Sequence, residues 1–236
     1  MIEGILFDMD GVLLDTERAG VQADCAAAAK LGFTLPEALA VQFCGAGRDR
    51  IFALLAQRFG PEFDCEAYWK LAAATWEQML ETGGLALRPG VAEALRELQA
   101  MGLPMAVASS TAAATARHRL AQMDILQYFL AVTGGDAVAQ GKPAPDIYLA
   151  AARSLGLPPQ GCLAVEDSHL GVQSASAAGC VTVMIPDLLP ATSAQREVCA
   201  AILNGMAALP ALVRHLQDTP GMQKAGNGIY SELTGY

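Results

Sequence analysis

Two carboxylates follow the first short apolar run of the chain. Ile5 to Phe7 leads directly into Asp8, and Asp10 comes two residues later, before Gly11. A carboxylate at the end of a buried strand can attack a phosphorus atom as a nucleophile. A second carboxylate beyond the strand end can protonate the leaving group and then act as the base for water. Gly11 permits the sharp turn that brings this second carboxylate back.

Further polar groups stand after later apolar runs. Ser109 ends one such run, the pair Glu166 and Asp167 ends another, and Lys142 lies in a loop between them. Ligands of open α/β sheets bind at the carboxyl ends of the strands, so we expect all these groups at one sheet edge. The hydroxyl of Ser109 and the backbone N–H of Ser110 can hold phosphoryl oxygens. Lys142 adds a compact positive charge.

The charge of this arrangement calls for a cation. Four carboxylates at one sheet edge repel each other, and either raised pKa values or a hard divalent ion relieves the repulsion. Mg²⁺ takes oxygen ligands and would also neutralise a phosphate. The formal charge of the chain is −9, and such a protein is repelled by nucleic acids and anionic membranes. We therefore expect Mg²⁺ as cofactor, a small phosphorylated metabolite as partner, and neither nucleic acid nor membrane.

The elements that position these residues alternate along most of the chain. Short apolar runs predict strands at 5–7, 105–108, 128–133, 162–165 and 181–185. Apolar residues at helical spacing predict helices at 91–101, 112–123, 146–155 and 170–178. Strands that alternate with helices form βαβ units, so the fold class is α/β with a Rossmann-like parallel sheet.

The segment 16–87 breaks this alternation. Its apolar spacing predicts helices at 17–31, 37–42, 49–59 and 65–81, separated by glycine and proline. We expect a catalytic core formed by 1–15 and 88–216, an all-helical cap at 16–87, and a weakly ordered tail at 217–236. Trp69 and Trp76 fall on one side of the last cap helix, which places them in the cap core or between cap and core.

Composition limits the remaining possibilities. The 236 residues are 53% hydrophobic and 17% charged, which suffices for a sizeable core. None of the six cysteines stands at CxxC spacing, so no zinc site is expected. The first residues show no signal-peptide pattern, and no apolar run is long enough to cross a bilayer. We expect a cytoplasmic protein with reduced thiols, present as a monomer or weak homo-oligomer.

Taken together, these motifs resemble the haloacid dehalogenase superfamily. Its four ordered motifs are similar to Asp8-Met9-Asp10-Gly11-Val12, Ser109, Lys142-Pro143-Ala144-Pro145-Asp146 and Glu166-Asp167-Ser168. The resemblance covers residues 1 to about 216, and the segment 16–87 resembles the helical cap of the type 1 members. Among these, β-phosphoglucomutase-like proteins and sugar-phosphate phosphatases look most similar.

The resemblance implies an activity and a set of ligands. A phosphatase of this kind hydrolyses a sugar phosphate through an aspartyl-phosphate on Asp8, with Asp10 as acid and base. Mg²⁺ would be held by the Asp8 carboxylate, the Asp10 backbone carbonyl and Asp167, with Glu166 in or next to the ligand set. Ser109 and Lys142 complete the catalytic group.

Arg48 is the candidate substrate contact from the cap, together with Ser110 from the core. It follows the turn Gly45 to Gly47 and opens a predicted helix. It either faces solvent or clamps a phosphate or carboxylate when the cap closes. Related mutases carry an arginine at the matching place, which supports the clamp.

Other interpretations remain open. Each motif alone has a structural explanation, as a turn, a helix cap or a solvated lysine. The main alternative is a β-phosphoglucomutase-like phosphomutase, but Gly20 stands where those mutases carry a cap histidine. The stretch Leu71 to Thr75 also lacks their lysine. A dehalogenase needs neither a metal nor an acid at Asp10, and a non-enzymatic module on this fold would need neither Asp8 nor Lys142.

Overall fold

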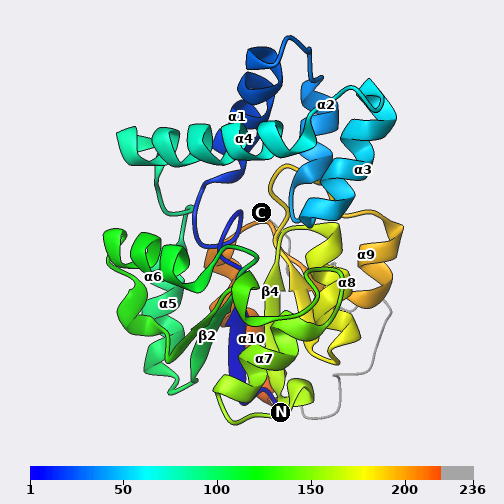
Figure 1. The fold of residues 1–236 in the computed structure, drawn as a ribbon. Helices are drawn as coiled ribbons and strands as arrows, with labels where there is room; N and C mark the ends of the chain where they lie inside the picture. The colour runs from blue at the N-terminus through cyan, green and yellow to red at the C-terminus, as the bar shows by residue number, and fades with distance from the viewer. Residues whose placement is uncertain (219–236) are drawn as a thin grey trace.

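The computed structural model of the chain describes residues 1–218, and its core is a six-stranded sheet (Figure 1). The strand order is β3-β2-β1-β4-β5-β6, and all neighbouring strands are parallel. The strands are β1 (Gly4–Phe7), β2 (Met105–Ala108), β3 (Ala131–Thr133), β4 (Cys162–Glu166), β5 (Val181–Met184) and β6 (Ala201–Ile202). The predicted α/β fold with a parallel sheet is confirmed. The chain turns from one half of the sheet to the other beside β1, and ligands of such sheets bind at this point.

Side chains alternate between the two faces of the sheet, because successive residues of a strand point to opposite sides. Phe7, Val107 and Val165 pack with the helices α5, α6 and α10. Leu6 and Ala106 point to the other face, where α7 and α8 cover them. The helices of the core are α5 (Val91–Ala100), α6 (Ala113–Gln122), α7 (Asp146–Ser154), α8 (His169–Ala177), α9 (Ser193–Val198) and α10 (Leu209–Asp218).

The segment after β1 forms a group of helices above the carboxyl edge of the sheet (Figure 1). These are α1 (Glu17–Lys30), α2 (Glu37–Ala40), α3 (Arg48–Phe59) and α4 (Cys65–Met79). They enclose a cluster of their own, in which Leu55 and Tyr68 are fully buried. The Asp64 side chain caps α4 by accepting a hydrogen bond of 2.9 Å from the Ala67 N–H. We use the name cap for this group.

Two adjacent chain segments connect the cap to the core. Leu14 and Leu87 form an antiparallel bridge. On either side of it, the Asp15 N–H donates to the Ala86 carbonyl and the Arg88 N–H donates to the Leu13 carbonyl, each at 2.9 Å. The cap is therefore attached through one paired connection.

The structure differs from the predicted secondary structure in several places. Leu126–Tyr128 form a 3-10 turn, so β3 begins only at Ala131. The strand β6 and the helix α9 were not predicted, because each is too short to show a periodic pattern of apolar residues. The helix α10 was not predicted; it reaches Asp218, so the first two residues of the predicted tail are helical, while the rest of that tail lies outside the described residues.

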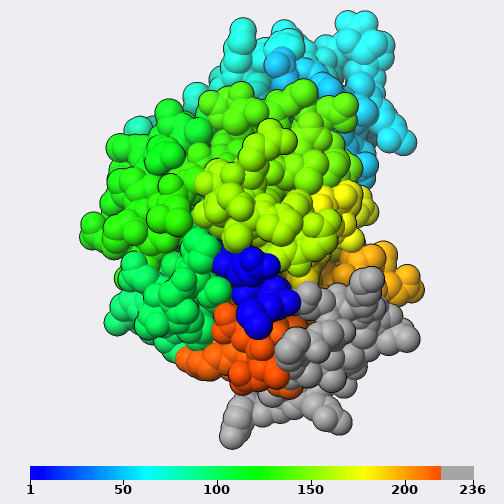
Figure 2. All heavy atoms as spheres, turned by 90° about the horizontal axis from the view of Figure 1, so that it is seen from below, coloured from blue at the N-terminus to red at the C-terminus, as the bar shows by residue number. Residues whose placement is uncertain are grey.

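The end of the core away from the cap carries the start of the chain. Met1 is exposed there, and the view from below shows the first residues at the surface between α7 and the C-terminal helix (Figure 2). In the part of the chain that the structure describes, no helix combines the length and apolarity needed to cross a membrane.

Candidate active site

The predicted core residues meet at the carboxyl edge of the sheet, beneath the cap. Asp8 directly follows β1, Ser109 directly follows β2, and Glu166 ends β4 and precedes Asp167. The four side chains are buried, as is Lys142 from the loop before α7. Strands of a parallel sheet end at the same edge, which explains why residues so distant in sequence come together.

Lys142 connects two of these carboxylates. Its Nζ lies 2.9 Å from Asp8 Oδ1 and 2.6 Å from Glu166 Oε1. Burial alone would lower the pKa of Lys142, but the charges of both carboxylates and their hydrogen bonds outweigh it and raise that pKa. The lysine is therefore a fixed cation next to Asp8.

Besides Lys142, several other hydrogen-bond donors hold the Glu166 carboxylate. Its Oε1 also accepts a hydrogen bond of 2.7 Å from the Tyr148 hydroxyl. Its Oε2 accepts from the backbone N–H groups of Asp167 and Ser168 and from the Ser168 hydroxyl. Gly171 leaves the room for this carboxylate, because a Cβ there would lie 1.9 Å from Oε1. The position of Lys142 is thus set by a rigid group.

Asp8, Glu166 and Asp167 form an acidic cluster in which one oxygen of each lies within 4.8 Å of the others. Burial raises the pKa of Asp8 to about 8 against the opposing charge of Lys142, and burial together with the neighbouring carboxylates raises the pKa of Asp167 well above its ordinary value. Asp167 Oδ1 is buried without a hydrogen-bond partner in residues 1–218. A buried carboxylate oxygen without a donor is costly unless it is protonated or binds a cation. The cluster therefore fits a hard divalent ion.

Glu17 adds a carboxylate that the sequence patterns did not single out. Burial raises its pKa to about 7, and the charges of Asp10, Asp187 and Glu166 act in the same direction. A Cβ on Gly11, whose φ is +79°, would lie 3.1 Å from Glu17 Cγ and 2.3 Å from Asp167 Oδ2. The sequence signal that could have indicated Glu17 is its position in the first turn of α1, shortly after the loop that carries Asp8 and Asp10.

Asp10 lies outside the acidic cluster found in the described residues. Its Oδ1 accepts a hydrogen bond of 2.7 Å from the Thr16 hydroxyl, and its Oδ2 accepts one of 2.9 Å from the Thr111 hydroxyl. Arg119 Nη1 lies 3.6 Å from Oδ1. Sequence reasoning missed Thr111 and Arg119. Thr111 extends the polar run that begins at Ser109, and Arg119 is a charged residue on the buried face of α6.

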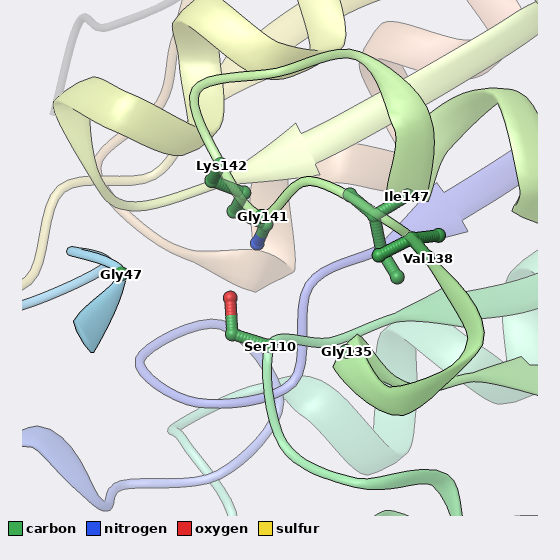
Figure 3. A pocket seen from close by; sticks show the side chains of 7 residues that line it. All are labelled: Gly47, Ser110, Gly135, Val138, Gly141, Lys142 and Ile147. Atoms are coloured by element: carbon green, nitrogen blue, oxygen red, sulfur yellow. The ribbon is translucent and has the colours of Figure 1, made fainter. Parts of the chain in front are cut away.

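A small pocket of about 140 Å³ opens beside Lys142. Ser110 points its hydroxyl into this pocket toward Lys142, and Gly47 of the cap lies across from it (Figure 3). Ser109 is fully buried, and its hydroxyl accepts a hydrogen bond from the Thr111 N–H. Of the two serines, Ser110 therefore faces the space that a substrate would occupy.

Arg48 is not brought to these residues in this conformation. Its guanidinium forms an ion pair with Glu66 and lies 4.9 Å from the ring of Phe52, all within the cap. The side chain is 46% exposed. The preceding residue, Gly47, lines the pocket, so the turn reaches the site while the arginine side chain points along the cap.

Comparison with known proteins identifies the family. The profile of the haloacid dehalogenase-like hydrolases matches residues 5–185. The chain belongs to this family. It is 33% identical over 199 residues to protein CbbY of Cupriavidus necator, with 78% of each chain covered. It is 34% identical to hexitol phosphatase A of Escherichia coli, covering 78% of this chain and 82% of that protein.

A solved structure of this family also superposes on the chain. It is a CbbY variant from Rhodobacter sphaeroides in complex with xylulose-1,5-bisphosphate. The TM-score is 0.74 at 28% identity, and the match covers 89% of this chain and 96% of that one. The hydrolase assignment is therefore supported by sequence and by fold.

Proposed function

We propose that this hydrolase is a Mg²⁺-dependent phosphatase of small phosphorylated sugars that works through an aspartyl-phosphate on Asp8. The observation that carries the proposal is the contact of Lys142 with Asp8 inside the acidic cluster. A buried lysine beside a strand-end carboxylate favours a dianionic ester as the reacting group. The names of similar proteins, a hexitol phosphatase and a protein bound to xylulose-1,5-bisphosphate, support the sugar class.

The proposed reaction has two steps. In the first, Asp8 attacks phosphorus, the bond from phosphorus to the leaving oxygen breaks, and Asp10 donates a proton to that oxygen. In the second, Asp10 takes a proton from water, whose oxygen attacks phosphorus and displaces the Asp8 carboxylate. Inorganic phosphate is released and both aspartates return to their starting states. Ser109, the Ser110 backbone N–H and Lys142 hold the phosphoryl oxygens.

The residues that would hold the cation are Asp8, the Asp10 backbone carbonyl and Asp167. When bound, Mg²⁺ neutralises the charge between these carboxylates and the phosphate. Oε1 of Glu166 already accepts hydrogen bonds from Lys142 and Tyr148. We propose that Glu166 contributes to the metal site mainly by its charge and by holding Lys142.

The location and the contribution of the cap are proposals as well. All six cysteines are free thiols, as expected in the cytoplasm, which we propose as the location. We propose that residues 16–87 act as a cap that selects the substrate, and that Arg48 turns toward the phosphorylated ligand on closure. The mutase remains the alternative activity.

The test is a hydrolysis screen of phosphorylated hexitols, hexoses and pentuloses, with and without Mg²⁺. We expect phosphate release that stops with EDTA, returns with Mg²⁺ and is absent from Asp8→Asn. Asp124→Asn is the matched control, since Asp124 is exposed and its φ of +55° also suits Asn. Release that survives exhaustive chelation, or from verified Asp8→Asn, contradicts the mechanism. Conversion of a hexose 1-phosphate to the 6-phosphate without phosphate release identifies the mutase instead.

A further inference from the structure

Arg119 is a buried charge at the boundary of core and cap. It belongs to α6 of the core, and its side chain is 3% exposed. Its Nη2 donates to Glu77 Oε1 of the cap helix α4 at 2.5 Å, and its guanidinium carbon lies 4.5 Å from the ring centre of Trp76. A buried guanidinium is costly unless it is paired. The nearest carboxylate, Glu77, comes from the cap, although the arginine belongs to the core.

The guanidinium of Arg119 also lies next to Asp10, the proposed general acid and base. Arg119 Nη1 lies 3.6 Å from Asp10 Oδ1. Neither Nη1 nor Nε has a hydrogen-bond partner among residues 1–218. Arg119 therefore retains buried donors next to the Asp10 carboxylate while its other contacts hold it to α4.

A second route connects α4 to Asp10. The indole Nε1 of Trp76 donates a hydrogen bond of 3.3 Å to the Thr16 carbonyl, and the Thr16 hydroxyl donates to Asp10 Oδ1. Trp76 and Glu77 are neighbours in the sequence. One end of one cap helix thus reaches Asp10 through Thr16 and through Arg119, so of the two predicted places for Trp76 the structure has the one between cap and core.

We propose that Arg119 is a positioning residue that holds the Asp10 carboxylate in line with the leaving oxygen, and that α4 sets the place of Arg119 through Glu77 and Trp76. This inference rests on the proposed phosphatase function. A unit charge at this distance orients a carboxylate strongly, and small misplacements of a catalytic group cost large factors in rate. Proton donation by Asp10 then depends on the position of the cap.

The experiment compares two aryl esters of similar shape in the full chain with Mg²⁺. Phenyl phosphate has a leaving group with a pKa of about 10 and needs protonation. The leaving group of p-nitrophenyl phosphate is more acidic and needs little. We expect Arg119→Met to lower kcat/KM for phenyl phosphate by roughly tenfold more than for p-nitrophenyl phosphate. Arg117→Met, an exposed arginine of the same helix, is the matched control and should change neither value.

Glu77→Gln provides a second variant that does not disturb the buried site, because the Glu77 side chain is 47% exposed. We expect the same selective loss for phenyl phosphate, smaller than in Arg119→Met. The double variant should be no worse than Arg119→Met alone, since both changes act on one interaction.

Equal losses for the two esters would mean that Arg119 only supports the fold, and would overturn the inference. A loss confined to p-nitrophenyl phosphate would overturn it too. If the wild-type chain releases phosphate from neither ester nor any compound of the screen, the proposed function itself fails. Wild-type turnover combined with equal losses removes this inference alone.

Discussion

The ammonium nitrogen of Lys142 lies 2.9 Å from Oδ1 of Asp8, the proposed nucleophile. In Lys142→Met a side chain of similar size fills the same space, but Asp8 loses the positive charge next to its carboxylate. We expect kcat/KM to fall by about 100-fold or more, the usual loss on removal of one charge-stabilising group. Steady-state kinetics with circular dichroism checks this. Lys70→Met, an exposed lysine of α4, is the control, and equal activity of both variants would contradict the assigned role.

Cation binding can be measured without any substrate. Mg²⁺ at 100 times its Kd should stabilise the folded chain by about 2.7 kcal/mol, which appears as a higher Tm. Ca²⁺ should be less effective because it prefers more ligands and looser geometry. Asp167→Asn should lose the shift, since Asp167 Oδ1 is a buried carboxylate oxygen without a hydrogen-bond partner among the described residues. Asp49→Asn on the cap surface should keep it, and an unchanged shift in Asp167→Asn would exclude this ligand.

The ion pair of Arg48 with Glu66 allows a test of the clamp proposal, because the two partners should change KM in opposite directions. If Arg48 leaves Glu66 to contact the substrate, the pair competes with binding. Arg48→Ala should then raise KM for a sugar phosphate, whereas Glu66→Gln should lower it. An exposed ion pair is worth about 0.2–1 kcal/mol, so the decrease in KM should be about fivefold at most. Changes of the same sign in both variants would assign the pair to cap stability alone.

Asp24 in α1 gives a pH dependence from a residue outside the acidic cluster of Asp8, Glu166 and Asp167. Burial raises its pKa to about 6, against the effect of the Tyr68 hydroxyl, which donates a hydrogen bond to it. The unfolded chain has the ordinary pKa of about 3.9 for this group. The folded state therefore holds the Asp24 proton more tightly than the unfolded state. The contribution of protonated Asp24 to the free energy of unfolding is complete below about pH 4 and is lost as the pH rises through 6.

Asp24→Asn keeps an acceptor for Tyr68 and never ionises. We expect the variant to be more stable than the wild type by about 3 kcal/mol at pH 7.5, with little difference near pH 4. Urea unfolding in EDTA at both pH values measures this. A difference independent of pH would mean that Asp24 does not titrate in this range.

The sequence pattern was most informative for the strands next to the site and for the cap helices, whereas the ten-residue helix α10 was not predicted. The three strands that carry site residues and all four cap helices were expected within a few residues of their observed bounds. The strand β6 was missed because Ala201–Ile202 is too short to show a period. The start of β3 was wrong because Tyr128 lies in a 3-10 turn, although its apolar neighbours continue the run.

Site residues were predicted where they stand at strand ends, since the topology alone brings Asp8, Ser109 and Asp167 together. Glu17 and Arg119 were not predicted, because they lie on helices, and the direction in which their side chains point depends on how the cap packs on the core. The direction of Arg48 likewise depends on a local partner, Glu66, and on the aromatic ring of Phe52. Such contacts between helices have no signature in spacing.

The bridge between Leu14 and Leu87 has a consequence for how this chain can be modified. The two segments that enter and leave the cap are already hydrogen-bonded to each other, like the base of a hairpin. Cutting out everything above that base would leave two ends that a short turn can join, without moving any strand of the sheet. We therefore expect the cap to be exchangeable as a unit where the contacts of Arg119 with α4 are kept, and grafting the equivalent segment of another chain onto this base tests whether the cap sets substrate preference.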